Sequence, residues 1–279
     1  MYTYLIPVLN LCPPAGFRVD TVLPLGEVRQ RVAGDDGRMT VVRITYSDGH
    51  VRSTEESPLE LRGGEWAVDD GARHNWPCDG PNWDTSDSLA CQEIYIRAEG
   101  ATRFTVRDFP SSFYSVFYGE GRKTYMNDLA IKFADPVQIA QMKAFGSWCV
   151  GYPACEVDPA RDVDESVALF NPYQRPASVT VELLDATGTP AGTKKARING
   201  LSGKRIAFSS ILPRSFMPWS GQMIVTGPNR LVVWVAKHSL ASPTRMTTLE
   251  HIDSYRGEAL KRPFTQAMHA RLHDWLRTR

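Results

Sequence analysis

Residues 166–188 read SVALFNPYQRPASVTVELLDATG, and this stretch decides the fold. It holds two short runs rich in Val, Leu and Thr, at 166–171 and 179–184, and each run ends in a group of Pro, Asn, Asp or Gly residues. Such runs are typical of antiparallel strands joined by tight turns. The same pattern continues downstream at 195–198, 205–208, 222–226 and 231–236. We therefore expect residues 165–249 to form one compact β-sandwich.

The composition is that of an ordinary globular protein. The 279 residues are 42% hydrophobic, which is enough for one large domain or two moderate domains with their own cores. The formal net charge of +1 gives no general attraction to nucleic acid or anionic lipid. No apolar run approaches the roughly 18 residues that span a bilayer, and residues 1–10 resemble a first strand more than a secretory signal. We expect a cytoplasmic protein without a membrane span or a nucleic-acid partner.

The five cysteines fit this assignment. An odd number of cysteines without an export signal predicts reduced thiols. The alternative, for an exported chain, is pairing of Cys78 with Cys91 and of Cys149 with Cys155. Neither spacing is a Cys-x-x-Cys motif, which argues against a structural zinc site.

The first half of the chain repeats the order of runs and turns found in the second half. The runs at 40–46, 66–68 and 92–97 correspond to those at 179–184, 205–208 and 223–226. The remaining matches set 58–61 against 195–198, and 102–106 against 231–235. Because residue identity between the halves is low, this order predicts a divergent duplication.

The sequence as a whole predicts an all-β chain of two tandem antiparallel β-sandwich domains, with a short linker helix and a C-terminal amphipathic helix. Asp135 and Pro136 have the residue types that begin a helix. The tail carries apolar residues near helical spacing between Arg and Lys residues. We expect this tail helix either to dock on a protein partner or, as the favoured alternative, to pack its apolar face on the sandwich. The domain boundaries are 1–133, 134–147 for the linker, 148–256, and 257–279 for the basic tail.

Several features of the second half occur together, namely Trp148, the pair Gly151-Tyr152, the run 164–171, the strand 177–184, the segment 204–213 and the pair 221–226 and 231–238. With this set, residues 146–256, about two-fifths of the chain, resemble the sensory rhodopsin transducer-like proteins. The resemblance implies an antiparallel sandwich, assembly into a homo-oligomer and a non-catalytic transducer or binding role. The chain differs from that family in its preceding domain and its basic C-terminal segment.

The first candidate site is a loop insertion in the first domain, from His74 to Asp87. It interleaves Trp76 and Trp83 with Asn82 and acidic residues. Indole faces stack on the apolar faces of sugar rings, while amides and carboxylates bond to the hydroxyls. This composition indicates a carbohydrate or small-molecule ligand. The alternative, which is favoured, is that the tryptophans plug the open end of the sandwich.

A second candidate site combines Arg107, Tyr114, Tyr118 and Glu120, where aromatic residues crowd near charges. Such a group suits the wall of a cleft, although core aromatics at the end of a strand have the same appearance and are favoured.

No phosphate loop, dinucleotide fingerprint or nucleophile elbow is present, and we expect no cofactor and no metal. His269 and His273 are one helical turn apart, but a solvated face of the tail helix explains them better than a metal site.

Two hypotheses of function follow. The first is a non-catalytic ligand-binding or signalling protein that uses Trp76, Asn82, Trp83, Arg107, Tyr114 and Tyr118. The second is an enzyme acting on a small polar or carbohydrate-like substrate at the cleft between the domains, with His74, Asp84, Asp87 and Glu120 as candidate acids and bases. A structural subunit of a larger assembly is a third hypothesis. We favour the first, because no recognised catalytic motif is present.

Overall fold

The computed structural model describes residues 2–11, 17–23, 38–47, 49–58, 61–62, 66–70, 88–89, 91–100, 112–119, 122–132, 148–171, 176–227, 231–242 and 245–252. Side chains are described at 40, 42–46, 49–58, 151–171, 176–227, 231–242, 245–250 and 252. The predicted linker helix at 134–147 and the predicted tail helix at 257–279 lie outside these residues.

The fold is all-β with antiparallel sheets, as the sequence predicts. The chain divides into two compact units, Met1–Asp135 and Pro136–Arg279. The strands of the first unit are β1 (Tyr2–Leu11), β2 (Phe17–Leu23), β3 (Arg38–Ser47), β4 (His50–Pro58), β5 (Leu61–Arg62), β6 (Trp66–Asp70), β7 (Ser88–Leu89), β8 (Cys91–Gly100), β9 (Ser112–Gly119) and β10 (Arg122–Lys132). The strands of the second unit are β11 (Trp148–Val157), β12 (Asp164–Asn171), β13 (Ala177–Asp185), β14 (Pro190–Ile198), β15 (Ser202–Ala207), β16 (Trp219–Gly227), β17 (Val232–His238) and β18 (Met246–His251). No helix in the described part of the chain is long and apolar enough to cross a membrane.

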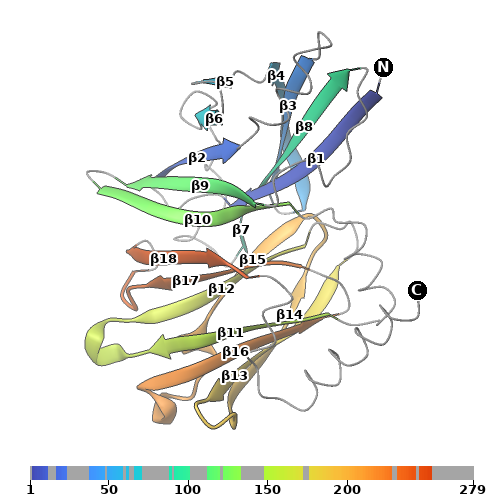
Figure 1. The fold of residues 1–279 in the computed structure, drawn as a ribbon. Helices are drawn as coiled ribbons and strands as arrows, with labels where there is room; N and C mark the ends of the chain where they lie inside the picture. The colour runs from blue at the N-terminus through green and yellow to red at the C-terminus, as the bar shows by residue number, and fades with distance from the viewer. Residues whose placement is uncertain are drawn as a thin grey trace, which may run out of the picture. The chain divides into compact units, whose positions relative to one another are not determined.

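Nine strands of the first unit form one sheet, in the order β4-β3-β8-β1-β10-β9-β2-β6-β5. Figure 1 shows that the sheet bends, because β1, β3 and β8 run across the direction of β2, β9 and β10. The two parts meet where β1 pairs with β10, at Val8↔Lys132 and Leu9↔Ile131.

The second unit has two sheets that stack as two layers (Figure 1). One sheet has the order β11-β16-β13-β14, and in the other β18, β17, β12 and β15 lie side by side. The core fills the space between them with alternate residues of each strand, such as Val179, Val181 and Leu183 of β13 and Val233 and Val235 of β17. The edge strand β14 carries exposed Lys195 and Arg197, and charges of this kind protect an edge from pairing with another chain.

Burial explains the continuous apolar run at residues 167–170. All eight residues of β12 are buried, so both faces of this strand are excluded from water. Phe170 on β12 and Trp234 on β17 are fully buried, although they face away from Val167 and Val233 of the core. A strand buried on both faces lacks the alternation of apolar and polar residues that a half-buried strand shows.

The two units share their strand order. The order β4-β3-β8-β1 of the first unit corresponds to β14-β13-β16-β11 of the second, and β10-β9-β2-β6 corresponds to β18-β17-β12-β15. Matched strands also occupy the same position in the sequence order of strands within each unit, when the two-residue strands β5 and β7 are not counted. The matches made from sequence between 40–46 and 179–184, 66–68 and 205–208, and 92–97 and 223–226 fall on β3 and β13, β6 and β15, and β8 and β16.

One of the sequence matches is wrong. The sequence pattern matches residues 58–61 to 195–198, which lie on β14. In the structure, however, the strand equivalent to β14 in the first unit is β4, His50–Pro58. This strand is a hairpin partner of β3, with Ser47 opposite His50 around Gly49, whose φ is +80°. Its residues 52–57 are all polar and Val51 is exposed, so it has no apolar alternation to reveal it. The run 102–106 lies outside the described residues.

Turns in the second unit form where the sequence places them. Oδ1 of Asp185 accepts hydrogen bonds from the backbone N–H groups of Thr187 and Thr189, both at 2.9 Å. The N–H of Gly188 donates to the carbonyl of Asp185, and Gly188 has a φ of +85°, which favours glycine. Asp185 therefore fixes the β13–β14 hairpin.

Candidate functional site

Most residues predicted to form a site lie outside the described part of the chain. These are His74, Trp76, Asn82, Trp83, Asp84, Asp87, Arg107 and Glu120. Tyr114 and Tyr118 lie on β9, where Tyr114 pairs with Val22 of β2 and Tyr118 pairs with Arg18 of β2 and Lys123 of β10. They belong to a strand, which is compatible with both the cleft-wall and the core-aromatic interpretations.

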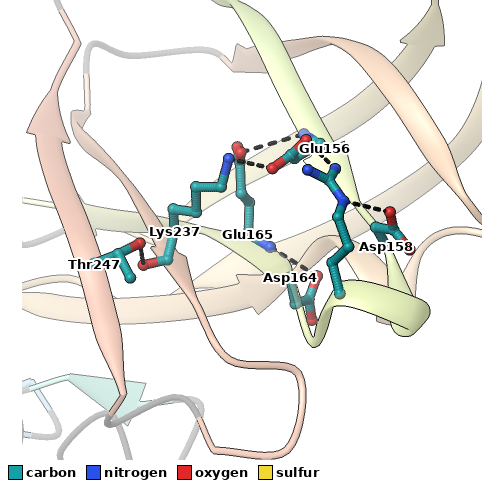
Figure 2. A network of polar contacts seen from close by, with 7 residues as sticks. Glu156, Asp158, Asp164, Glu165, Lys237 and Thr247 are labelled. Atoms are coloured by element: carbon teal, nitrogen blue, oxygen red, sulfur yellow. Dashed lines mark hydrogen bonds and ion pairs between the residues drawn. The ribbon is translucent and has the colours of Figure 1, made fainter.

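The described residues bring together a different polar group, which we call the seam cluster: Tyr152, Cys155, Glu156, Glu165, Lys237 and Glu250. It lies where β11, an edge strand of one sheet, faces β18, an edge strand of the other. The hydroxyl of Tyr152 on β11 donates a hydrogen bond to Oε2 of Glu250 on β18, at 3.1 Å. Figure 2 shows that Glu156, Glu165 and Lys237 point toward one another from β11, β12 and β17.

Glu156 is the ionised centre of the cluster. Its carboxylate forms an ion pair with Lys237, and Nη2 of Arg161 donates to its other oxygen at 2.7 Å. Nε of Arg161 also bonds to Asp158, at 2.6 Å (Figure 2). The bonds to Lys237 and Arg161 hold the pKa of the Glu156 carboxyl below its usual range.

Glu165 differs, because it is a carboxyl group in a nearly dry environment. Only 3% of the residue is exposed. Oε1 accepts a hydrogen bond from the backbone N–H of Glu156 at 3.2 Å, whereas Oε2 is buried without a partner among the described residues. Burial raises the pKa of Glu165 to about 7, since the charged form loses its hydration. Near neutral pH the group is therefore divided between its acid and its carboxylate forms.

Two neighbours of Glu165 keep their protons. Cys155 is 1% exposed and its thiol is free, so the alternative disulfide to Cys149 is not formed. Burial, and next the charge of Glu165, raise the pKa of the Cys155 thiol. Burial and the charge of Glu250 raise the pKa of the Tyr152 hydroxyl. Neither group is a nucleophile at neutral pH, because nucleophilic thiols are those with lowered pKa values.

A second polar group joins β12 to β17 on the other face of β12. Oγ of Ser166 and Nε2 of His238 are 2.6 Å apart, and Nδ1 of His238 is 2.9 Å from the carbonyl of Ser239. A carbonyl can only accept, so Nδ1 carries the proton and Ser166 donates to Nε2. Burial lowers the pKa of His238, which favours this neutral form. Ser166 has no exposed surface, so the pair is closed to a substrate.

Asp164 completes this group, but not as the third member of a catalytic triad. Its Oδ2 accepts from the Ser209 hydroxyl at 2.5 Å, and its Oδ1 accepts from the backbone N–H of Ser209 at 3.1 Å. Nδ1 of His238, which a triad carboxylate would orient, is bonded to a carbonyl instead. The three residues therefore tie strands and turns together.

The described residues give no metal site. Within that part of the chain, no three or more His, Cys, Asp or Glu residues are placed to hold a metal ion. His269 and His273 lie outside it.

Sequence reasoning missed the seam cluster, although one signal was present. Glu165 is two residues before Val167 and four before Leu169, and alternation along a strand places the three on one face. A carboxylate in step with core residues predicts either a pairing partner or a raised pKa. The partners Lys237 and Glu156 could not be found this way, because they are brought together only by the pairing of distant strands.

Comparisons with known proteins leave the family open. No protein-family model matches the sequence, and no curated protein matches it. Among solved structures, the chain is similar to one described as "Biofilm associated protein - BSP domain", with 8% sequence identity and a TM-score of 0.26. The match covers 91% of this chain, which spans 61% of the length of that structure. A likeness at this level supports no statement on function.

Proposed function

We propose that this chain is a non-catalytic binding or signalling protein built from two repeats of an antiparallel β unit. The observation that carries this proposal is the state of Ser166, His238 and Asp164. They have the chemistry of a hydrolase, yet they are buried, and each is bonded to structural partners. Because these potentially reactive groups are used for structural hydrogen bonds, they support the proposal of a protein that binds a ligand without catalysing its conversion.

The proposal includes common ancestry of the two units. Its support is the strand order, which is the same in eight strands of each unit. In a duplicated scaffold, function resides in what one copy has and the other lacks. The insertion with Trp76 and Trp83 in the first half is such a difference, and we assign it the ligand, a carbohydrate or a small polar metabolite. The resemblance to transducer-like proteins adds a homo-oligomer, and the basic residues of the tail add a protein partner there.

Calorimetric titration with soluble oligosaccharides and polar metabolites, chosen by a thermal-shift screen, tests the ligand assignment. A ligand that binds only the folded protein raises its melting temperature. We expect W76A and W83A to weaken binding about tenfold or more, which is about 1.4 kcal/mol or more for each variant. Phe216→Ala is the control, because it removes an exposed aromatic side chain from the second unit and should leave the Kd unchanged. Equal binding by all variants would remove the insertion from the proposal.

The second candidate function, an enzyme using carboxylate acid–base chemistry, is favoured by one observation. Burial raises the pKa of Glu165 to about 7, and groups with such values are frequent in active sites. An enzyme of this kind would lose turnover on replacement of Glu165 by Gln, whereas a binding protein would keep its ligand affinity.

A further inference from the structure

The two units differ at one pair of corresponding strands, β1 and β10 in the first unit and β11 and β18 in the second. We call the place where these two strands meet the seam. In the first unit, β1 and β10 close this seam by backbone pairing at Val8↔Lys132 and Leu9↔Ile131. In the second unit, the corresponding strands β11 and β18 belong to separate sheets. The polar contacts described between β11 and the other sheet are made by side chains: the Tyr152 hydroxyl bonds to Glu250, Glu156 pairs with Lys237, and Glu165 accepts from the Glu156 N–H. One copy is thus closed by backbone pairing, and the other by side chains that can titrate.

Glu165 lies directly behind this side-chain closure. Its Oε1 is fixed by the backbone N–H of Glu156 on β11, so the carboxyl group links the buried strand β12 to the last strand of the other sheet. Its Oε2 is buried without a donor among the described residues. A carboxylate in this position leaves a charged oxygen unsatisfied, which costs more free energy than the unbonded but neutral hydroxyl of a carboxylic acid.

The groups that face Glu165 supply too little positive charge to offset its burial: the charge of Lys237 favours the carboxylate, but burial has the larger effect on the pKa. These groups are Tyr152, Cys155 and Glu156 on β11, Lys237 on β17, Glu250 across the seam on β18 and Arg161 beside Glu156. Both cations are already engaged by the Glu156 carboxylate, and Arg161 bonds to Asp158 as well. Asp164, the neighbour of Glu165 in sequence, bonds to Ser209 instead.

We propose that the seam between β11 and β18 is a proton-controlled latch, which is closed while Glu165 is protonated and loosens when Glu165 releases its proton to solvent. The ionised carboxylate regains its hydration only if β11 moves away from β18. Negative charge on Glu156 favours the same movement. Loosening frees the outer edge of β11, which has the pairing capacity that β1 uses in the first unit.

The size of the effect follows from the acidity of Glu165 in the two states. The pKa is about 7 in the closed seam and returns to its ordinary value of 4.5 when water reaches the group. Linkage then requires the opening equilibrium constant to rise about tenfold between pH 6 and pH 8. The opening constant levels off only below about pH 3.5, where Glu165 is protonated in both states.

Cys155 reports this opening, because it is buried behind the seam beside Glu165. The experiment measures alkylation of Cys155 in the full-length protein from pH 5 to pH 9, with peptide fragmentation to separate its label from that of Cys149. Each rate is divided by the rate for the urea-unfolded chain at the same pH, which removes the intrinsic ionisation of the thiol. We expect the protection of Cys155 to fall about tenfold from pH 6 to pH 8 in the wild type.

Two variants distinguish the latch from a general loss of structure. Glu165→Gln is close in shape and cannot ionise, so its Cys155 protection should not depend on pH. Tyr152→Phe removes the bond across the seam, so it should lower protection at every pH and keep the tenfold change. A wild type without the change, or a Glu165→Gln protein with the same change, would overturn the proposal. If Glu165→Gln does not fold, hydrogen exchange of residues 152–157 in the wild type decides: uniform protection from pH 6 to pH 8 rejects the latch.

Discussion

The hydroxyl of Tyr152 and the carboxylate of Glu250 are 3.1 Å apart, 98 residues distant in sequence and on different sheets of the second unit. In a β-sandwich the sheets are otherwise held by apolar contacts between their inner faces. This polar contact therefore adds a directional link at the margin of the sandwich.

Removing the Tyr152 hydroxyl should weaken the second unit slightly. The bond is exposed, so Tyr152→Phe should lower the free energy of unfolding by about 0.5–1 kcal/mol. Urea denaturation of Tyr152→Phe, Glu250→Gln and the double variant measures the coupling between the two side chains. Strictly additive losses would show that the pair does not interact in solution.

Stability should decrease as pH rises from about 4.5 to 7. The pKa of Glu165 is higher in the folded protein, at about 7, than in the unfolded chain, at 4.5, so the folded protein binds more protons over this interval. The contribution is fully present below pH 4.5 and is lost through pH 7, by about 3 kcal/mol at most. Denaturation of wild type and Glu165→Gln at several pH values measures it. Parallel pH profiles would contradict the assignment.

The opposite slope should appear in acid. The pKa values of Glu156, Asp158, Asp162 and Asp185 are lowered in the folded protein, by bonds from Lys237, Arg161, Ser239 and Thr187 respectively. Their contributions are present above the unfolded values near 4 and disappear as pH falls through the folded ones. His238 acts in the same direction, because its lowered pKa removes stability as pH falls below its ordinary value of 6.5. The maximum of stability should therefore lie in the weakly acidic range, which the same denaturation series locates.

Gly221 should not accept a side chain. It lies opposite Cys155 beside the irregularity of β11, and a Cβ there would be 1.9 Å from the carbonyl oxygen of Leu184 and 2.8 Å from the Trp219 ring. Gly221→Ala should cost about 3 kcal/mol, the upper part of the range for overpacking. Gly188→Ala is the matched control: a Cβ meets nothing within 4 Å, and only the positive φ costs about 1–2 kcal/mol. Equal losses in thermal denaturation would be inconsistent with this packing.

Of the two phenylalanines in short helical turns, Phe208 should contribute more to the free energy of unfolding than Phe216. It is fully buried, and its ring packs edge-on against Trp219 with centroids 6.3 Å apart. Phe208→Ala should cost about 3–5 kcal/mol, through lost burial and a cavity. Phe216 is 46% exposed, so Phe216→Ala should change stability by less than about 0.5 kcal/mol. Similar melting temperatures for the two variants would refute this ranking.

Some strands could be predicted from their apolar runs, whereas others, among them Phe17–Leu23 with its apolar residues, were not predicted. The runs at 166–171 and 179–184 became β12 and β13, because Val, Leu and Thr alternate or continue there and turn residues bound them. His50–Pro58 was not predicted as a strand. It is a largely polar edge strand, so pairing with β3, and not burial of apolar side chains, determines its conformation. Phe113–Tyr118 was interpreted as a cleft wall or as strand-end core, and it belongs to β9.

The seam cluster illustrates what local patterns omit. Strand alternation alone places Glu165 on the core face, and so predicts a perturbed carboxyl group. Its environment, however, depends on Glu156 from β11 and Lys237 from β17, which are 9 and 72 positions away. No spacing rule connects these positions, because the register between strands is set by the whole sandwich. The site predicted from Trp76 and Trp83 stays a prediction.

The shared strand order has a consequence for how the chain acquires its structure during synthesis. Two neighbouring units with the same order of strands offer each other equivalent partners, and exchange of such partners is a known failure of repeat proteins. Here the corresponding strands have different residues, for example polar His50–Pro58 against the lysine-rich Pro190–Ile198. A strand from one half is therefore a poor substitute in the other, and sequence divergence itself guards the nascent chain against cross-pairing.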